Sequence, residues 1–131
     1  MTALVLDAGA LIALDRNDRT VWAMLRVAAN NATEVSVPAG AIAQAWRDGA
    51  RQALLARALK HCDEVPLDGA LARASGALCG HASTADVVDA SIAIIAAARS
   101  RHGHVAIVTS DPGDLSKLIN MLNAPVRIAA I

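Results

Sequence analysis

Five aspartates occupy positions where a metal-dependent enzyme could use them. Asp7 ends the apolar run Ala3–Leu6, and Asp111 follows a later apolar run, Val105–Thr109. Asp86 and Asp89 are three residues apart, so on a helix they share one face. Asp114 lies three residues beyond Asp111 and completes the set. If the two apolar runs are neighbouring strands and a helix begins above them, all five carboxylates converge in one cleft.

Carboxylates in one cleft repel each other and raise each other's pKa values. A hard divalent cation removes that repulsion, and Mg²⁺ is commonly held by one or two carboxylates with water and phosphate oxygens. Mg²⁺ or Mn²⁺ in such a cleft suits phosphodiester hydrolysis, because the ion lowers the pKa of a water and stabilises developing charge. The acids therefore predict a metal-dependent phosphodiesterase.

Structural interpretations of the same acids compete with this one. The sequence Asp111-Pro112-Gly113-Asp114 has the pattern of a helix N-cap with proline at the first helical position. Ser83 and Asp86 form a similar capping-box pattern, and Asp7 could cap a helix near Gly9. Asp89 is harder to explain structurally. It interrupts the apolar segment VVDASIAII, where an unpaired buried carboxylate costs several kcal/mol.

The elements that must position these acids follow from hydrophobic pattern and breaker residues. The predicted strands are Ala3–Leu6, Glu34–Val37, Glu64–Leu67, Val105–Thr109 and Val126–Ala130. The predicted helices are Gly9–Leu14, Thr20–Ala29, Ala39–Arg47, Arg51–His61, Asp68–Leu78, Thr84–Arg101 and Pro112–Leu122. Alternating strands and helices predict an α/β fold with a mostly parallel central sheet and helices on both faces. Ligands of such sheets bind beyond the carboxyl ends of the strands.

The composition is that of a single globular domain and differs from that of strongly basic nucleic-acid-binding domains. The 131 residues suit one domain, and 55% are hydrophobic, which provides a sizeable core. The formal net charge is zero, so the chain lacks the strongly basic balance of many nucleic-acid-binding domains. The only aromatic residues are Trp22 and Trp46, for which we expect core or interface positions, so aromatic stacking on RNA is poorly served.

Cellular location follows from what the sequence lacks. Cys62 and Cys79 have no metal-ligand spacing, and two isolated cysteines fit a reducing cytosol. The N-terminus has no signal-peptide pattern, and the longest apolar run is well short of the roughly 20 residues that cross a bilayer. We therefore expect a cytoplasmic protein without a membrane partner.

Three segments together resemble the PIN-domain ribonucleases, specifically the VapC-type toxins of type II toxin–antitoxin systems. They are VLDAGALIAL, TADVVDASIAIIAAA and VAIVTSDPGDL, in this order. The resemblance covers residues 1–131, which it identifies as one PIN-like domain. It implies a homodimeric Mg²⁺- or Mn²⁺-dependent endoribonuclease that cuts an RNA substrate and is neutralised by a small cognate antitoxin protein.

The resemblance also assigns roles to the acids. It implies that Asp7, Asp89 and Asp111 are catalytic and bind the metal, and that Asp114 matches a later family acid. Asp86 is an additional neighbour that we expect at the metal site. One position departs from the family: Gln44 stands where a glutamate is usual. Gln44 can support the site through its carbonyl oxygen but brings no charge.

Several alternatives remain from sequence alone. Arg47 and Arg51, four residues apart, could share a helix face that contacts RNA or an acidic antitoxin segment, or could be solvated surface. Gln44 and the neutral charge keep open a catalytically weak PIN-like module that binds antitoxin or RNA without cleavage. A phospho-acceptor receiver or an aspartate-based phosphatase also places Asp at strand ends. The phosphatase, however, wants a second Asp where this chain has Gly9.

Overall fold

The centre of the protein is a five-stranded, entirely parallel β-sheet. The computed structural model describes residues 2–131. The strands are β1 (Ala3–Leu6), β2 (Glu34–Pro38), β3 (Asp63–Val65), β4 (Val105–Thr109) and β5 (Val126–Ala130). They lie in the order β3-β2-β1-β4-β5, and every adjacent pair is parallel. The predicted sheet is confirmed, and β3 ends two residues earlier than expected.

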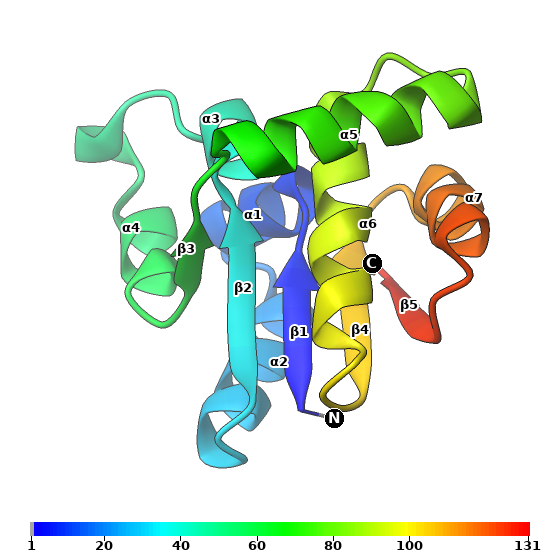
Figure 1. The fold of residues 1–131 in the computed structure, drawn as a ribbon. Helices are drawn as coiled ribbons and strands as arrows, with labels where there is room; N and C mark the ends of the chain where they lie inside the picture. The colour runs from blue at the N-terminus through cyan, green and yellow to red at the C-terminus, as the bar shows by residue number, and fades with distance from the viewer. Residues whose placement is uncertain (1) are drawn as a thin grey trace.

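Helices connect successive strands and cover the sheet. They are α1 (Ala8–Asp15), α2 (Arg19–Asn30), α3 (Ala39–Ala45), α4 (Ala53–Leu59), α5 (Gly69–Ala82), α6 (Val87–Arg99) and α7 (Pro112–Leu122), with a short 3-10 turn, η1 (Gly49–Arg51), before α4. Figure 1 shows α6 in front of the sheet and α1 and α2 behind it. The predicted arrangement with helices on both faces is thus confirmed.

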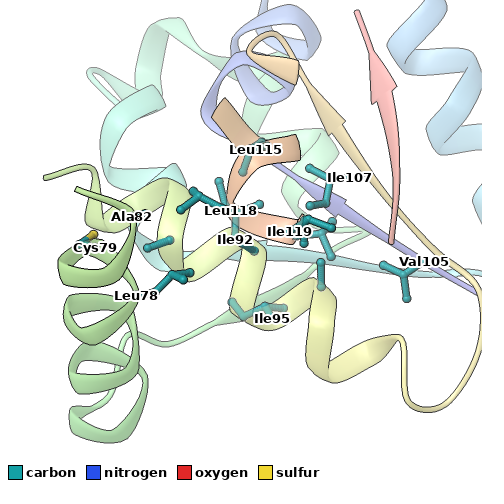
Figure 2. Packing of buried hydrophobic residues seen from close by; sticks show 14 of the residues in the cluster. Leu78, Cys79, Ala82, Ile92, Ile95, Val105, Ile107, Leu115, Leu118 and Ile119 are labelled. Atoms are coloured by element: carbon teal, nitrogen blue, oxygen red, sulfur yellow. The ribbon is translucent and has the colours of Figure 1, made fainter. Parts of the chain in front are cut away.

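Each face of the sheet has its own hydrophobic core. One core joins α5, α6 and α7 to the sheet; Figure 2 shows Ile92 of α6 packed among Leu78, Leu118 and Ile119. The other core joins the sheet to α1–α4 and includes the fully buried Leu11, Leu14 and Leu55. Burial on both faces explains why the central strands are continuous apolar runs instead of alternating ones.

The order of the strands reverses between β1 and β4, and this reversal marks a position at the carboxyl ends of the two strands. From β1 the chain moves outward through β2 to β3, then returns to place β4 on the other side of β1. The connections that leave β1 and β4 therefore diverge to opposite sides. Open α/β sheets bind ligands at this reversal of strand order, beyond the carboxyl ends of the strands. Asp7 directly follows β1 at this point, and Asp111 lies two residues after β4.

Several predicted helix boundaries are wrong. α5 continues to Ala82 and ends at Ser83, which has a left-handed backbone (φ 55°), so α6 begins at Val87 rather than at Thr84. α3 ends at Ala45 because the backbone of Trp46 is extended (φ −77°, ψ 127°). Trp46 is consequently 39% exposed, which contradicts core burial, whereas Trp22 is half-buried.

No single helix within residues 2–131 is long and apolar enough to cross a membrane. α5 and α6 meet that criterion only as a pair, and they are bent by 108° at the break between them.

The core on the α6 face gives a direct test of the fold. We expect Ile92→Ala to lower the free energy of unfolding by about 2–5 kcal/mol, because Ile92 is fully buried and truncation leaves a cavity. Val27→Ala, at a position that is 57% exposed, should change it by less than about 0.5 kcal/mol. Urea unfolding measures both; equal effects of the two substitutions would contradict the burial of Ile92 in this core.

Candidate metal centre

Asp7 is buried at the carboxyl end of β1 and both of its carboxylate oxygens are engaged. Oδ1 accepts a hydrogen bond from the backbone N–H of Ala10 at 2.8 Å, so Asp7 is the N-cap of α1. Oδ2 accepts a hydrogen bond from the hydroxyl of Thr109 at 2.5 Å. Each oxygen retains a second lone pair, since an ionised carboxylate offers about four acceptor sites. Capping therefore leaves Asp7 able to bind a cation.

Thr109 joins the two acid-bearing strand ends. Its hydroxyl donates to Asp7 and accepts a hydrogen bond from the backbone N–H of Asp111 at 2.8 Å. Leu6 pairs with Val108 in the parallel ladder, so the next residues, Asp7 and Thr109, stand side by side. The sequence does not indicate Thr109 as a site residue, because its role depends on the pairing of β1 with β4, which a single sequence does not show.

Asp86 and Asp89 mark the start of α6. Asp86 is the N-cap, and its Oδ1 accepts a hydrogen bond from the backbone N–H of Asp89 at 3.0 Å. The helix cap is therefore Asp86 itself, and the predicted capping box with Ser83 is wrong because Ser83 terminates α5. Asp89 lies in the first turn and is half-buried, as its position in an apolar segment predicted.

Asp111 and Asp114 belong to the start of α7. Asp111 occupies the N-cap position and Pro112 the first turn, but the side chain of Asp111 makes no capping hydrogen bond. Capping therefore does not account for this carboxylate. Both acids are exposed, and Asp114 lies one turn into the helix.

Three of the five acids come close enough to share one ion. Asp89, Asp111 and Asp114 can each offer a carboxylate oxygen such that the three oxygens lie within 4.8 Å of one another. A cleft of about 170 Å³ adjoins them; it is lined in part by Asp86, Asp89, Asp114 and Lys117. Lys117 was not predicted at the site, although its spacing of three from Asp114 places both on one face of α7.

The acids disturb each other electrostatically. Burial, followed by the negative charges of Asp86 and Asp111, raises the pKa of Asp89 to about 7. The charges of Asp7 and Asp114 add to this shift in the same direction. Loss of hydration, and then the neighbouring carboxyl of Asp114, also raises the pKa of Asp111. The negative charges of the cluster are therefore not fully balanced by nearby positive charges within residues 2–131, and a bound cation would stabilise them.

The donor set fits a hard divalent cation. Oxygen ligands from carboxylates are what Mg²⁺ and Mn²⁺ prefer, and a cluster of mutually repelling acids gains most from such a charge. Asp89, Asp111 and Asp114 would hold the ion directly. Asp7 is electrostatically coupled to Asp89 and Asp111, and it faces the same sheet edge.

Gly9 keeps the first turn of α1 compatible with this site. A Cβ atom at residue 9 would lie 1.9 Å from the hydroxyl oxygen and 2.6 Å from the Cβ of Ser110, so a side chain there collides with the residue that follows β4. The second aspartate that an aspartate-based phosphatase needs at this position therefore cannot be accommodated.

Among residues 2–131, the remaining predicted residues form no hydrogen bond or ion pair with the clustered acids. Gln44 is exposed on α3, and no hydrogen bond joins it to the acids within residues 2–131. Arg47 donates to the carbonyl oxygens of Ala43 and Trp46, at 3.0 and 2.8 Å, and so closes the end of α3. Arg51 lies in η1, so the prediction that Arg47 and Arg51 share a helix face is wrong because α3 ends before either residue.

The parallel sheet and its strand order define an α/β domain that carries a group of acids at the carboxyl ends of β1 and β4. Among solved structures the chain matches the crystal structure of VapBC2 from Rickettsia felis bound to a DNA fragment from their promoter, with a TM-score of 0.64 and 12% identity. The match covers 98% of both chains. No family model and no curated protein matches the sequence. The fold expected from the PIN-domain resemblance is thereby confirmed.

The hydroxyl of Thr109 provides the first test of the site. Thr109→Val keeps the shape of this fully buried side chain but leaves Asp7 Oδ2 and the N–H of Asp111 without their partner. We expect a loss of about 1–3 kcal/mol in the free energy of unfolding. Thr109→Ser keeps the hydroxyl and serves as the control. An unchanged stability in Thr109→Val would contradict the link between the two strand ends.

The raised pKa of Asp89 provides the second test. The ordinary pKa is 3.8 and the folded value is about 7. Ionisation of Asp89 therefore lowers the free energy of unfolding of the metal-free protein as pH rises through this interval. Above the interval the loss is constant. We expect Asp89→Asn to raise the melting temperature in EDTA at about pH 8, with a benefit that shrinks towards about pH 5.

The control for this measurement is Glu64→Gln, which neutralises an exposed acid on β3, outside the cluster. It should show no comparable dependence on pH. A melting temperature of Asp89→Asn at or below that of the wild type at about pH 8 would contradict the electrostatic description of the cluster.

Proposed function

We propose that the protein is a Mg²⁺- or Mn²⁺-dependent endoribonuclease that acts as the toxin of a toxin–antitoxin pair in the cytoplasm. The observation that carries the proposal is the convergence of Asp89, Asp111 and Asp114 within 4.8 Å, beside Asp7, at the edge where strand order reverses. The likeness of the fold to a chain of the VapBC2 complex supports the toxin assignment and a small antitoxin partner. The homodimer is proposed from the family resemblance of the sequence.

The residues of the cleft divide the work of phosphodiester hydrolysis. When bound, a divalent cation would neutralise the acids, activate the attacking water and stabilise charge on the phosphate. Asp89, Asp111 and Asp114 would hold the ion, while Asp7 and Asp86 would contribute negative potential around it. Thr109 fixes the orientation of Asp7 through its hydroxyl. Lys117 lines the cleft and presents a cation to the phosphate backbone of an RNA strand.

Cleavage of an RNA pool tests this proposal. We expect the purified, antitoxin-free protein to give discrete fragments with Mg²⁺ or Mn²⁺ and none with EDTA. Asp111→Asn should lower the rate at least about a hundredfold, because it removes a charged ligand of the ion. Glu64→Gln should cleave at the wild-type rate. Full activity of Asp111→Asn, or cleavage in EDTA, would contradict the proposal.

A second candidate function is a PIN-like module that binds antitoxin or RNA without cleaving. The exposed, uncharged Gln44 favours it, because the family resemblance places a glutamate there. Under this alternative the folded wild-type protein gives no metal-dependent fragments, and Gln44→Glu restores them. Equal cleavage by the wild type and Gln44→Glu would eliminate it.

A further inference from the structure

A second pocket lies between α2 and α4, and arginines give it a positive charge. Its volume is about 390 Å³, and its lining residues are Asn17, Arg19, Trp22, Arg26, Leu54 and Arg57. It shares no residue with the acidic cleft. Three arginines and no acid line it, in a chain whose formal net charge is zero.

The arginines of this pocket are available to a ligand. The ion pairs among residues 2–131 involve Arg51 and Arg99, and none involves Arg19, Arg26 or Arg57. All three are exposed. Guanidinium groups bind phosphate with two parallel hydrogen bonds, which makes them well suited to a phosphorylated ligand.

Trp22 gives the pocket an aromatic surface between two of these charges. Arg19, Trp22 and Arg26 are spaced by three and four residues on α2, so their side chains share one face of the helix. The indole Nε1 donates to the carbonyl oxygen of Leu14 at 3.0 Å, which holds the half-buried ring in place. A fixed indole beside guanidinium groups is the combination on which bases of single-stranded nucleic acid stack.

We propose that this pocket binds one nucleotide of a single-stranded RNA, with the base on Trp22 and the phosphates on Arg19, Arg26 and Arg57. Its volume suits a ligand of this size. An acidic peptide would satisfy the arginines but would leave the indole without a planar partner. The proposal takes RNA as the ligand class from the proposed function, but it does not depend on metal-dependent cleavage.

Intrinsic fluorescence offers a direct readout, because the chain has only two tryptophans. In Trp46→Phe the signal comes from Trp22 alone. Titration with a mixed-sequence RNA dodecamer in EDTA should quench it saturably. In this background, Arg26→Gln and Arg57→Gln should each weaken binding about tenfold, the effect of losing one charge-assisted hydrogen bond. Each should also lower the slope of log K against log salt by about 0.7.

The matched control is Arg101→Gln, which removes the same charge from an exposed turn outside the pocket. It should change the affinity less than about twofold. Absence of saturable quenching, or equal weakening by Arg101→Gln, would overturn the proposal. Tighter binding of poly-glutamate than of RNA would assign the pocket to an acidic protein segment and would overturn it as well.

The same titration separates this proposal from the proposed function. In the Trp46→Phe background the titration in EDTA reports Trp22 alone, whereas fragments form only in the cleavage assay with Mg²⁺ or Mn²⁺. Cleavage without quenching of Trp22 would overturn only the proposal of a nucleotide pocket. Quenching without metal-dependent cleavage would overturn only the proposed nuclease function.

Discussion

Repulsion among carboxylates at one sheet edge is the constraint that the rest of the structure must balance. Five acids meet where β1, β4, α6 and α7 begin or end. Burial of Asp89, together with the negative charges of the other four, raises its pKa to about 7. Two apolar cores oppose this cost from either face of the sheet. Backbone N–H groups of α1 and α6 offset part of it, because Asp7 and Asp86 each cap a helix. The remaining charge deficit is what a divalent cation would supply.

The sequence was most informative where local pattern and tertiary environment agree. β1, β4, β5 and α7 were predicted with the bounds that the structure shows, because apolar runs and breaker residues such as Pro112 define them. The start of α6 was less predictable. Ser83 fits a capping box in sequence, yet its left-handed backbone ends α5, and a single sequence does not distinguish these two roles.

The sequence likewise indicated some residues of the candidate site and not others. The acids could be found from their positions at strand ends and in an apolar helix. Thr109 could not, because its hydrogen bonds require the pairing of β1 with β4. The shared helix face predicted for Arg47 and Arg51 is wrong because α3 ends at Ala45, ahead of both. The pocket on α2 escaped notice because Arg57 reaches it from α4, a helix that is distant in sequence.

Calorimetric titration with Mn²⁺ at about pH 7 tests most directly whether the acids form a metal centre. The clustered carboxylates predict saturable binding with release of protons, since Asp89 is partly protonated near its pKa of about 7. Buffers of different ionisation enthalpy report that release. Asp111→Asn should abolish the binding, while Glu64→Gln should leave it unchanged. Absence of binding to the wild type, or binding of equal strength to Asp111→Asn, would contradict a metal centre at this edge of the sheet.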